Sequence, residues 1–184
     1  MKFGYYEDDA EVFEFLRKDS DSTRKCIEAE VMDFADDVAY SVHDFEDAVV
    51  SGYVNLSELA SESNHTEYFS KFQSWAGSEL SIADIQAAFS RLSSNLYWLK
   101  SYSSSMADQA TLKNLTSYLI GSFVGRSTEH TLASNSSQHL VRYNGALSVP
   151  SDVRAEIAVL KGTVSVFLMT DEKRQPYYLS LIHI

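Results

Sequence analysis

Three side chains that could take part in metal binding recur at helical spacing within residues 32–47. Asp36, Tyr40 and Asp44 lie four residues apart, so a helix would place them on one face, about one turn from each other. The same stretch holds six acidic side chains among sixteen residues. Close carboxylates repel one another, and burying them is costly unless a cation or hydrogen-bond donors compensate. This column of side chains therefore needs a compensating partner, either a divalent metal or hydrogen-bond donors.

The spacing alone leaves simpler interpretations of each residue open. Asp36 could lie on a solvated helix face or cap a neighbouring segment. Tyr40 could be a core tyrosine with its hydroxyl at the rim, and Asp44 could be a surface carboxylate. Three other acidic residues of the stretch are interpreted as structural, ion-paired side chains: Asp37, Glu46 and Asp47.

One long helix would position these residues. Apolar residues recur along it at steps of three and four, which predicts a helix with one buried side. This apolar stripe consists of Ile27, Val31, Phe34 or Ala35, Val38, Val42, Phe45 and Val49. We expect the helix to run from about residue 23 to residue 51, ending near Gly52. Four residues of the stripe are expected to be buried: Val31, Val38, Val42 and Phe45.

The rest of the chain also favours helices. Apolar spacing predicts them over residues 8–19, 57–76, 81–99, 108–126 and 150–170. Ser81 and Asp84 form a variant of the capping box, which marks a helix start. Asn144-Gly145, between two short runs rich in β-forming residues, predicts a β-hairpin over residues 138–149. We therefore expect a single all-α domain over residues 1–184 with one small β-hairpin.

Composition excludes several classes of function. The 184 residues are 45% hydrophobic, enough for one domain with a core. A formal net charge of -11 makes the surface a poor match for nucleic acid, which needs a basic face. We expect no membrane span, because the sequence has no apolar run of sufficient length, and no secretory signal, because residues 1–9 have no apolar core region. The single cysteine, Cys26, excludes an internal disulfide and fits a reducing cytoplasm.

The sequence of residues 28–47, EAEVMDFADDVAYSVHDFED, resembles a helix motif of a known family. The motif, A-D-D-I-A-Y-x-x-x-D-x-E-D, belongs to the HD-domain deoxynucleoside triphosphate triphosphohydrolases, the dGTPase-like proteins. Weaker agreement continues over several further segments: residues 2–6, 112–117, 119–121 and 154–161. The resemblance covers most of the chain and implies an HD-domain-like helical fold.

The resemblance also implies an activity and roles for individual residues. Family members bind a divalent metal such as Mg²⁺ or Mn²⁺ through two histidines and two aspartates. They hydrolyse a dNTP such as dGTP to deoxynucleoside and triphosphate, by attack of water on the α-phosphate. Carried over to this chain, Asp36 is the last metal ligand, Tyr40 contacts the phosphates and Asp44 contacts the deoxyribose. No catalytic acid, base or nucleophile is assigned, and relatives are often homo-oligomers.

The rest of the family's metal site is not found in this sequence. In the family, one histidine and a consecutive His-Asp pair precede the part that matches residues 2–6. His43-Asp44 is a His-Asp dipeptide, but it follows Asp36 and is not that pair. We therefore expect this chain to be the C-terminal part of a longer enzyme, without its N-terminal metal-binding half and inactive alone. Residues 179–184 are abruptly apolar and are interpreted as non-native.

The remaining candidates are weaker, and a different class of function stays open. His65, His130 and His139 have no ligand-like spacing around them. Some basic side chains could reach phosphates in a whole enzyme, although such residues are usually solvated: Arg126, Arg142 and Lys161. The alternative to a triphosphohydrolase is a non-catalytic helical module for interaction or regulation, related to the family but without metal.

Overall fold

The structure is a computed structural model that describes residues 5–18, 20, 24–77, 80–136 and 139–169. Within these residues it is all-α, with seven α-helices, two short 3-10 helices and no strand, as the sequence predicts for the fold class. The α-helices are α1 (Ala10–Arg17), α2 (Ile27–Val50), α3 (Leu56–Leu59), α4 (His65–Ala76), α5 (Ile82–Ser93), α6 (Met106–Ser134) and α7 (Ser151–Met169). The 3-10 helices are η1 (Glu7–Asp9) and η2 (Glu62–Asn64).

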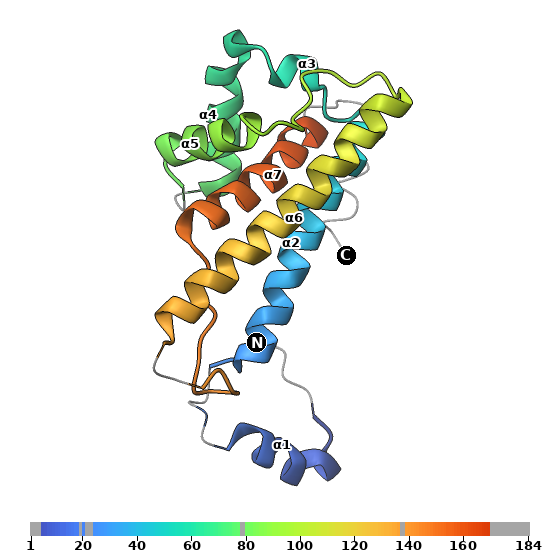
Figure 1. The fold of residues 1–184 in the computed structure, drawn as a ribbon. Helices are drawn as coiled ribbons and strands as arrows, with labels where there is room; N and C mark the ends of the chain where they lie inside the picture. Colours follow the sequence, from blue (N-terminus) through green and yellow to red (C-terminus); the bar gives the residue numbers. More distant parts are fainter. Residues whose placement is uncertain (1–4, 19, 21–23, 78–79, 137–138, 170–184) are drawn as a thin grey trace.

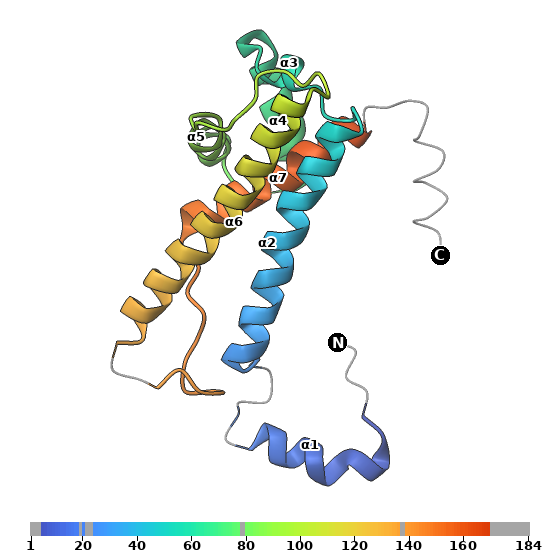
Figure 2. The same cartoon turned by 45° about the vertical axis from the view of Figure 1, so that its right-hand side comes forward.

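The long helices α2 and α6 pack against each other, and α7 packs against α2 on one side and against α4 and α5 on the other. Figures 1 and 2 show α1 lying apart from this bundle, below the N-terminal end of α2. None of the described helices is long and apolar enough to cross a membrane. Helix α2 is thus a long outer element whose position depends on α6 and α7.

The core contains the predicted apolar stripe of α2, with one exception. Val38, Val42 and Phe45 are each at most 2% exposed, as predicted. Val31 is 48% exposed, so its predicted burial is wrong. Val31 is the fifth residue of α2, and Figure 2 shows α2 and α6 diverging toward that end of the helix. Periodicity identifies the inward side of a helix, but it cannot show where the neighbouring helix departs.

The segment over residues 57–76 was expected to be one helix, and the structure breaks it into three pieces. Asn55 caps the start of helix α3: its side-chain oxygen accepts from the backbone N–H groups of Ser57 and Glu58. The chain then turns through η2 before α4 begins at His65. Asn64 donates to the carbonyl of Glu58 at 3.1 Å, so side-chain bonds replace the helical ones at the break.

Local signals predict one end of α5 but not the other. The Ser81 hydroxyl accepts from the N–H of Asp84 at 3.1 Å, and the Asp84 carboxylate accepts from the N–H of Ser81 at 3.2 Å, so the capping box is present. The helix ends at Ser93, and Leu96, expected on its apolar side, is 87% exposed. Asn95 accepts from the N–H of Tyr97 at 2.8 Å and so stabilises the turn that stops the helix.

The predicted β-hairpin is wrong for the described part of residues 138–149, which contains no strand. A two-residue hairpin turn of the favoured type needs positive φ at both central residues. The positive φ of this segment, 51°, is instead at Arg142. Its backbone bonds to helices: the carbonyl of Arg142 accepts from Ile27 N at 2.9 Å, and Leu147 N donates to the Glu30 carboxylate at 2.7 Å. These partners hold the segment against the start of α2.

One close contact fixes how α7 crosses α4. A Cβ atom built at Gly162 would lie 1.9 Å from Cε2 of Phe72, a fully buried ring of α4. The absence of a side chain therefore allows the two helices to approach. Tyr68 of α4 and Thr163 of α7 share a buried hydrogen bond of 2.5 Å next to this crossing.

Candidate functional site

Helix α2 places the three predicted site residues on its outward face. Asp36, Tyr40 and Asp44 are all exposed, and Tyr40 keeps 65% of its surface open. Val38 and Val42, which alternate with them, point into the core. Successive members of the column are four residues apart, a rise of about 6 Å per step along the axis. The three side chains thus form an accessible row that a ligand could contact along its length.

The column has no internal partners. Among the described residues, none of the three side chains makes a hydrogen bond, an ion pair or a ring contact. An exposed carboxylate without a partner keeps its oxygens available to a cation or a hydroxyl group. We refer to Asp36, Tyr40 and Asp44 as the outer column.

The ion pairs predicted for Asp37 and Glu46 are present, whereas Asp47 forms none among the described residues. Asp37 Oδ1 lies 2.8 Å from Lys161 Nζ of α7. The Glu46 carboxylate binds Lys113 of α6 and accepts from Thr116 Oγ1 at 2.7 Å. Adjacent residues of a helix point about 100° apart, so Asp36 and Asp37 diverge at the surface. The helix therefore separates carboxylates that hold the fold from carboxylates that remain free.

Glu46 is the buried member of the paired set, at 4% exposed. Burial alone would raise the pKa of Glu46. The hydrogen bonds from Lys113 and Thr116, with the charge of Lys113, outweigh this effect and lower the pKa below its ordinary value. Glu46 in turn raises the pKa of Lys113. The carboxylate thus stays ionised although its side chain is almost out of contact with water.

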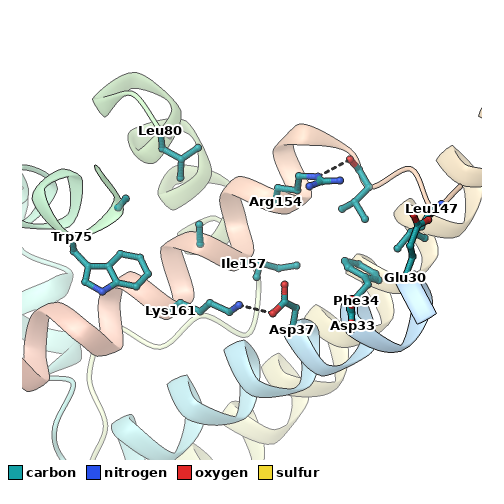
Figure 3. Close-up of a pocket in the computed structure, with 13 residues that line it drawn as sticks. Glu30, Asp33, Phe34, Asp37, Trp75, Leu80, Leu147, Arg154, Ile157 and Lys161 are labelled. Carbon is teal, nitrogen blue, oxygen red and sulfur yellow. Dashed lines mark hydrogen bonds and ion pairs between the residues drawn. The ribbon is translucent and has the colours of Figure 1, made fainter. Parts of the chain in front are cut away.

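A pocket of about 720 Å³ lies beside the outer column, between α2, α7 and the end of α4. Figure 3 shows the Lys161–Asp37 pair across it, with Trp75 on one side and Arg154 on another. The outer column does not line this pocket. No spacing in the sequence predicts this pocket, because its walls come from separate segments that only the fold brings together. Its remaining lining residues are Glu30, Asp33, Phe34, Ala76, Leu80, Leu147, Val149, Ile157 and Ala158.

The basic residues that could have reached phosphates have partners within the chain. Arg126 pairs with Asp152 and with Glu156, the latter at 2.8 Å. Its hydrogen bonds to Glu156 are the main cause that raises the pKa of Arg126. Arg142 donates to the carbonyl of Leu16 at 3.0 Å. With Lys161 on Asp37, all three side chains support the fold.

The described residues do not form a complete metal site. No group of three or more His, Cys, Asp and Glu side chains in this part of the chain could hold an ion. His43 lies 3.9 Å from the Glu46 carboxylate, and the ring nitrogens of His65 and His130 bond to backbone carbonyls. The exposed carboxylate of Asp36 has the chemistry of a metal ligand, but a single carboxylate does not hold an ion tightly.

Known proteins with similar sequences share one description. The chain is 39% identical over 176 residues to a deoxyguanosinetriphosphate triphosphohydrolase-like protein of Streptomyces coelicolor, covering 94% of this chain and 42% of that protein. It is 33% identical to proteins of the same description from Bifidobacterium longum and Corynebacterium diphtheriae, covering 96% and 92% of this chain. These matches span 37% and 40% of the two relatives. No family model and no solved structure matches the chain.

The similarity extends along nearly the whole chain and includes the helix that carries the outer column. The chain spans about two fifths of the length of these relatives. The family resemblance of residues 28–47 is thereby confirmed, and this chain belongs to the deoxyguanosinetriphosphate triphosphohydrolase-like proteins.

Proposed function

We propose that this chain is the C-terminal part of a cytoplasmic, metal-dependent dNTP triphosphohydrolase and supplies the substrate-binding face of α2. The observation that supports this proposal is the outer column: three polar side chains at the family's positions, exposed and without partners in the described chain. The upstream part of the protein would complete the site.

In the proposed reaction, water attacks the α-phosphorus of a dNTP and the bond from phosphorus to the 5′ oxygen breaks. The 5′ oxygen leaves with a proton, so the products are deoxynucleoside and triphosphate. A divalent metal, when bound, would polarise phosphate oxygens and lower the pKa of water. Asp36 would be one of its ligands, and two histidines and an aspartate outside the matched region would be the others.

The remaining members of the column would orient the nucleotide. The Tyr40 hydroxyl can donate a hydrogen bond to a phosphate oxygen, which draws charge toward a fixed donor. The Asp44 carboxylate can accept from a hydroxyl of the deoxyribose. The outer column would thus contact the nucleotide from its phosphates to its sugar. Because the three side chains project from one rigid helix, they would favour a single orientation of the bound nucleotide.

The test compares this chain with the complete protein encoded with it, using dGTP and Mn²⁺. We expect triphosphate and deoxyguanosine from the complete protein and no turnover from residues 1–184 alone. Release of pyrophosphate, or robust triphosphate release by the isolated chain, would contradict the proposal. A complete protein that lacks an upstream histidine and His-Asp pair, and has no turnover, would instead support the alternative of a non-catalytic helical module.

A further inference from the structure

Glu46 is a carboxylate buried at the junction of α2 and α6. Only 4% of its surface is exposed, and its partners Lys113 and Thr116 both belong to α6. Taking a carboxylate out of water is costly, and well-packed apolar groups often replace a buried ion pair without loss of stability. Such a residue can instead specify one packing arrangement among several.

The rest of the contact between α2 and α6 does not select a register. Within the described residues, every hydrogen bond and ion pair between these two helices runs through Glu46. Most other buried side chains of the two helices are apolar, among them Val38, Val42, Phe45 and Val49 of α2 and Leu112, Leu115, Leu119 and Phe123 of α6. Apolar burial is non-directional, so these apolar side chains alone do not select one register. The hydrogen bond to Thr116 is directional and fits one register only.

The register of α2 sets where the outer column lies. Asp44 is two residues before Glu46, a rotation of about 200°, so it points away from α6 while Glu46 points into it. A one-turn slide moves every side chain of the helix by about 5.4 Å. That displacement would take Asp44 and Tyr40 out of hydrogen-bond reach of a nucleotide held by the rest of the enzyme.

We propose that Glu46 is a positioning residue that sets the register of α2 against α6 and thereby places Asp44 and Tyr40 against the nucleotide. This inference rests on the proposed function. Glu46 itself touches no substrate, since it faces α6. Thr116 is the partner of Glu46 in this arrangement. The residue is 7% exposed, and its hydroxyl donates to the Glu46 carboxylate across the helix junction.

The experiment measures sugar recognition, which a merely structural role would leave unchanged. In the complete protein, kcat/KM is determined for dGTP and for its 2′,3′-dideoxy analogue, which lacks the 3′ hydroxyl. If Asp44 accepts from that hydroxyl, the wild type should prefer dGTP by about ten- to one-hundredfold, the usual worth of a hydrogen bond to a charged group. Asp44→Asn provides the reference in which this preference is reduced.

Four further variants separate positioning from folding. Glu46→Gln and Thr116→Val should reduce the preference for dGTP toward that of Asp44→Asn. Thr116→Ser keeps the hydroxyl and should retain the wild-type preference, which makes it the matched control for Thr116→Val. Glu67→Gln removes the exposed pair between Glu67 and Lys71 on α4 and should also retain it. Circular dichroism establishes that each variant is folded. If Glu46→Gln does not fold, the preference of Thr116→Val for dGTP over the dideoxy analogue tests the inference alone.

Two results would overturn the inference in distinguishable ways. A wild-type protein that releases no triphosphate would refute the proposed function, and the inference with it. An active wild type in which Glu46→Gln and Thr116→Val slow both substrates equally would refute the inference alone, because the ratio would then report only a loss of folded enzyme.

Discussion

Asp36 and Asp37 are adjacent in α2, yet only Asp37 is engaged, with its Oδ1 atom 2.8 Å from Lys161 Nζ of α7. Figure 3 shows Asp37 turned toward Lys161 across the pocket between the two helices. Asp36 is exposed and has no partner in the described part of the chain. The same residue type therefore serves two purposes at consecutive positions, because the helix turns about 100° between them.

This difference predicts opposite consequences for two alanine variants of the complete protein. Asp36→Ala should remove most turnover and most bound metal, since it deletes a ligand. Asp37→Ala should keep the metal and lose only the surface pair to Lys161, which is worth about 0–1 kcal/mol of folding stability. Metal analysis and turnover of both variants check this. Loss of metal in Asp37→Ala with retention in Asp36→Ala would show that the assignment is wrong by one residue.

Tyr40→Phe should separate phosphate contact from folding. The Tyr40 ring is 65% exposed and its hydroxyl has no partner among the described residues, so the thermal midpoint should not change. Metal content should also be unchanged. The value of kcat/KM should fall, because the transition state loses about 1–3 kcal/mol of stabilisation, the usual contribution of a hydrogen bond to a charged group. Unchanged kcat/KM for dGTP would place Tyr40 outside the substrate site.

Gly162→Ala should destabilise the chain by forcing α7 away from α4. The added Cβ would meet the buried ring of Phe72, and overpacking of this kind costs about 1–3 kcal/mol. The matched control is Gly125→Ala on α6, where a Cβ would meet nothing within 4 Å. That substitution should stabilise the helix by about 0.5–1 kcal/mol. Urea unfolding of both variants provides the comparison, and equal effects would contradict the close crossing.

The stabilising effect of Glu46 should depend on pH. Its pKa is lowered in the folded chain, so the unfolded state takes up a proton first as the pH falls. The contribution is fully present above the ordinary glutamate pKa and is lost as the pH falls through the lowered folded value. The difference in unfolding free energy between wild type and Glu46→Gln should therefore be constant near neutral pH and change in acid. Urea titrations from pH 7 to about pH 3 measure it, and a pH-independent difference would contradict the buried ion pair.

The sequence was sufficient for features that depend on nearby residues. Spacing predicts α2 and the burial of Val38, Val42 and Phe45, and Ser81 with Asp84 marks the start of α5. These signals succeed because a helix is built from bonds and contacts within one or two turns.

Features that depend on distant residues could not be predicted. The sequence indicates that Asp37 and Glu46 are paired, but only the fold shows that their partners are Lys161, 124 positions away, and Lys113. Asn144-Gly145 favours a hairpin locally, and bonds from that segment to α2 and α6 override it. Within the candidate site, spacing places the outer column on one helix, whereas the assignment of metal, phosphate and sugar contacts depends on the family resemblance.

The most direct test of the account is a crystal structure of the complete protein with a divalent metal and a non-hydrolysable dNTP analogue. The account predicts Asp36 as a metal ligand, the Tyr40 hydroxyl on a phosphate oxygen and the Asp44 carboxylate on the deoxyribose, in that order along α2. A nucleotide bound in the pocket between α2 and α7, with the outer column facing solvent, would contradict it.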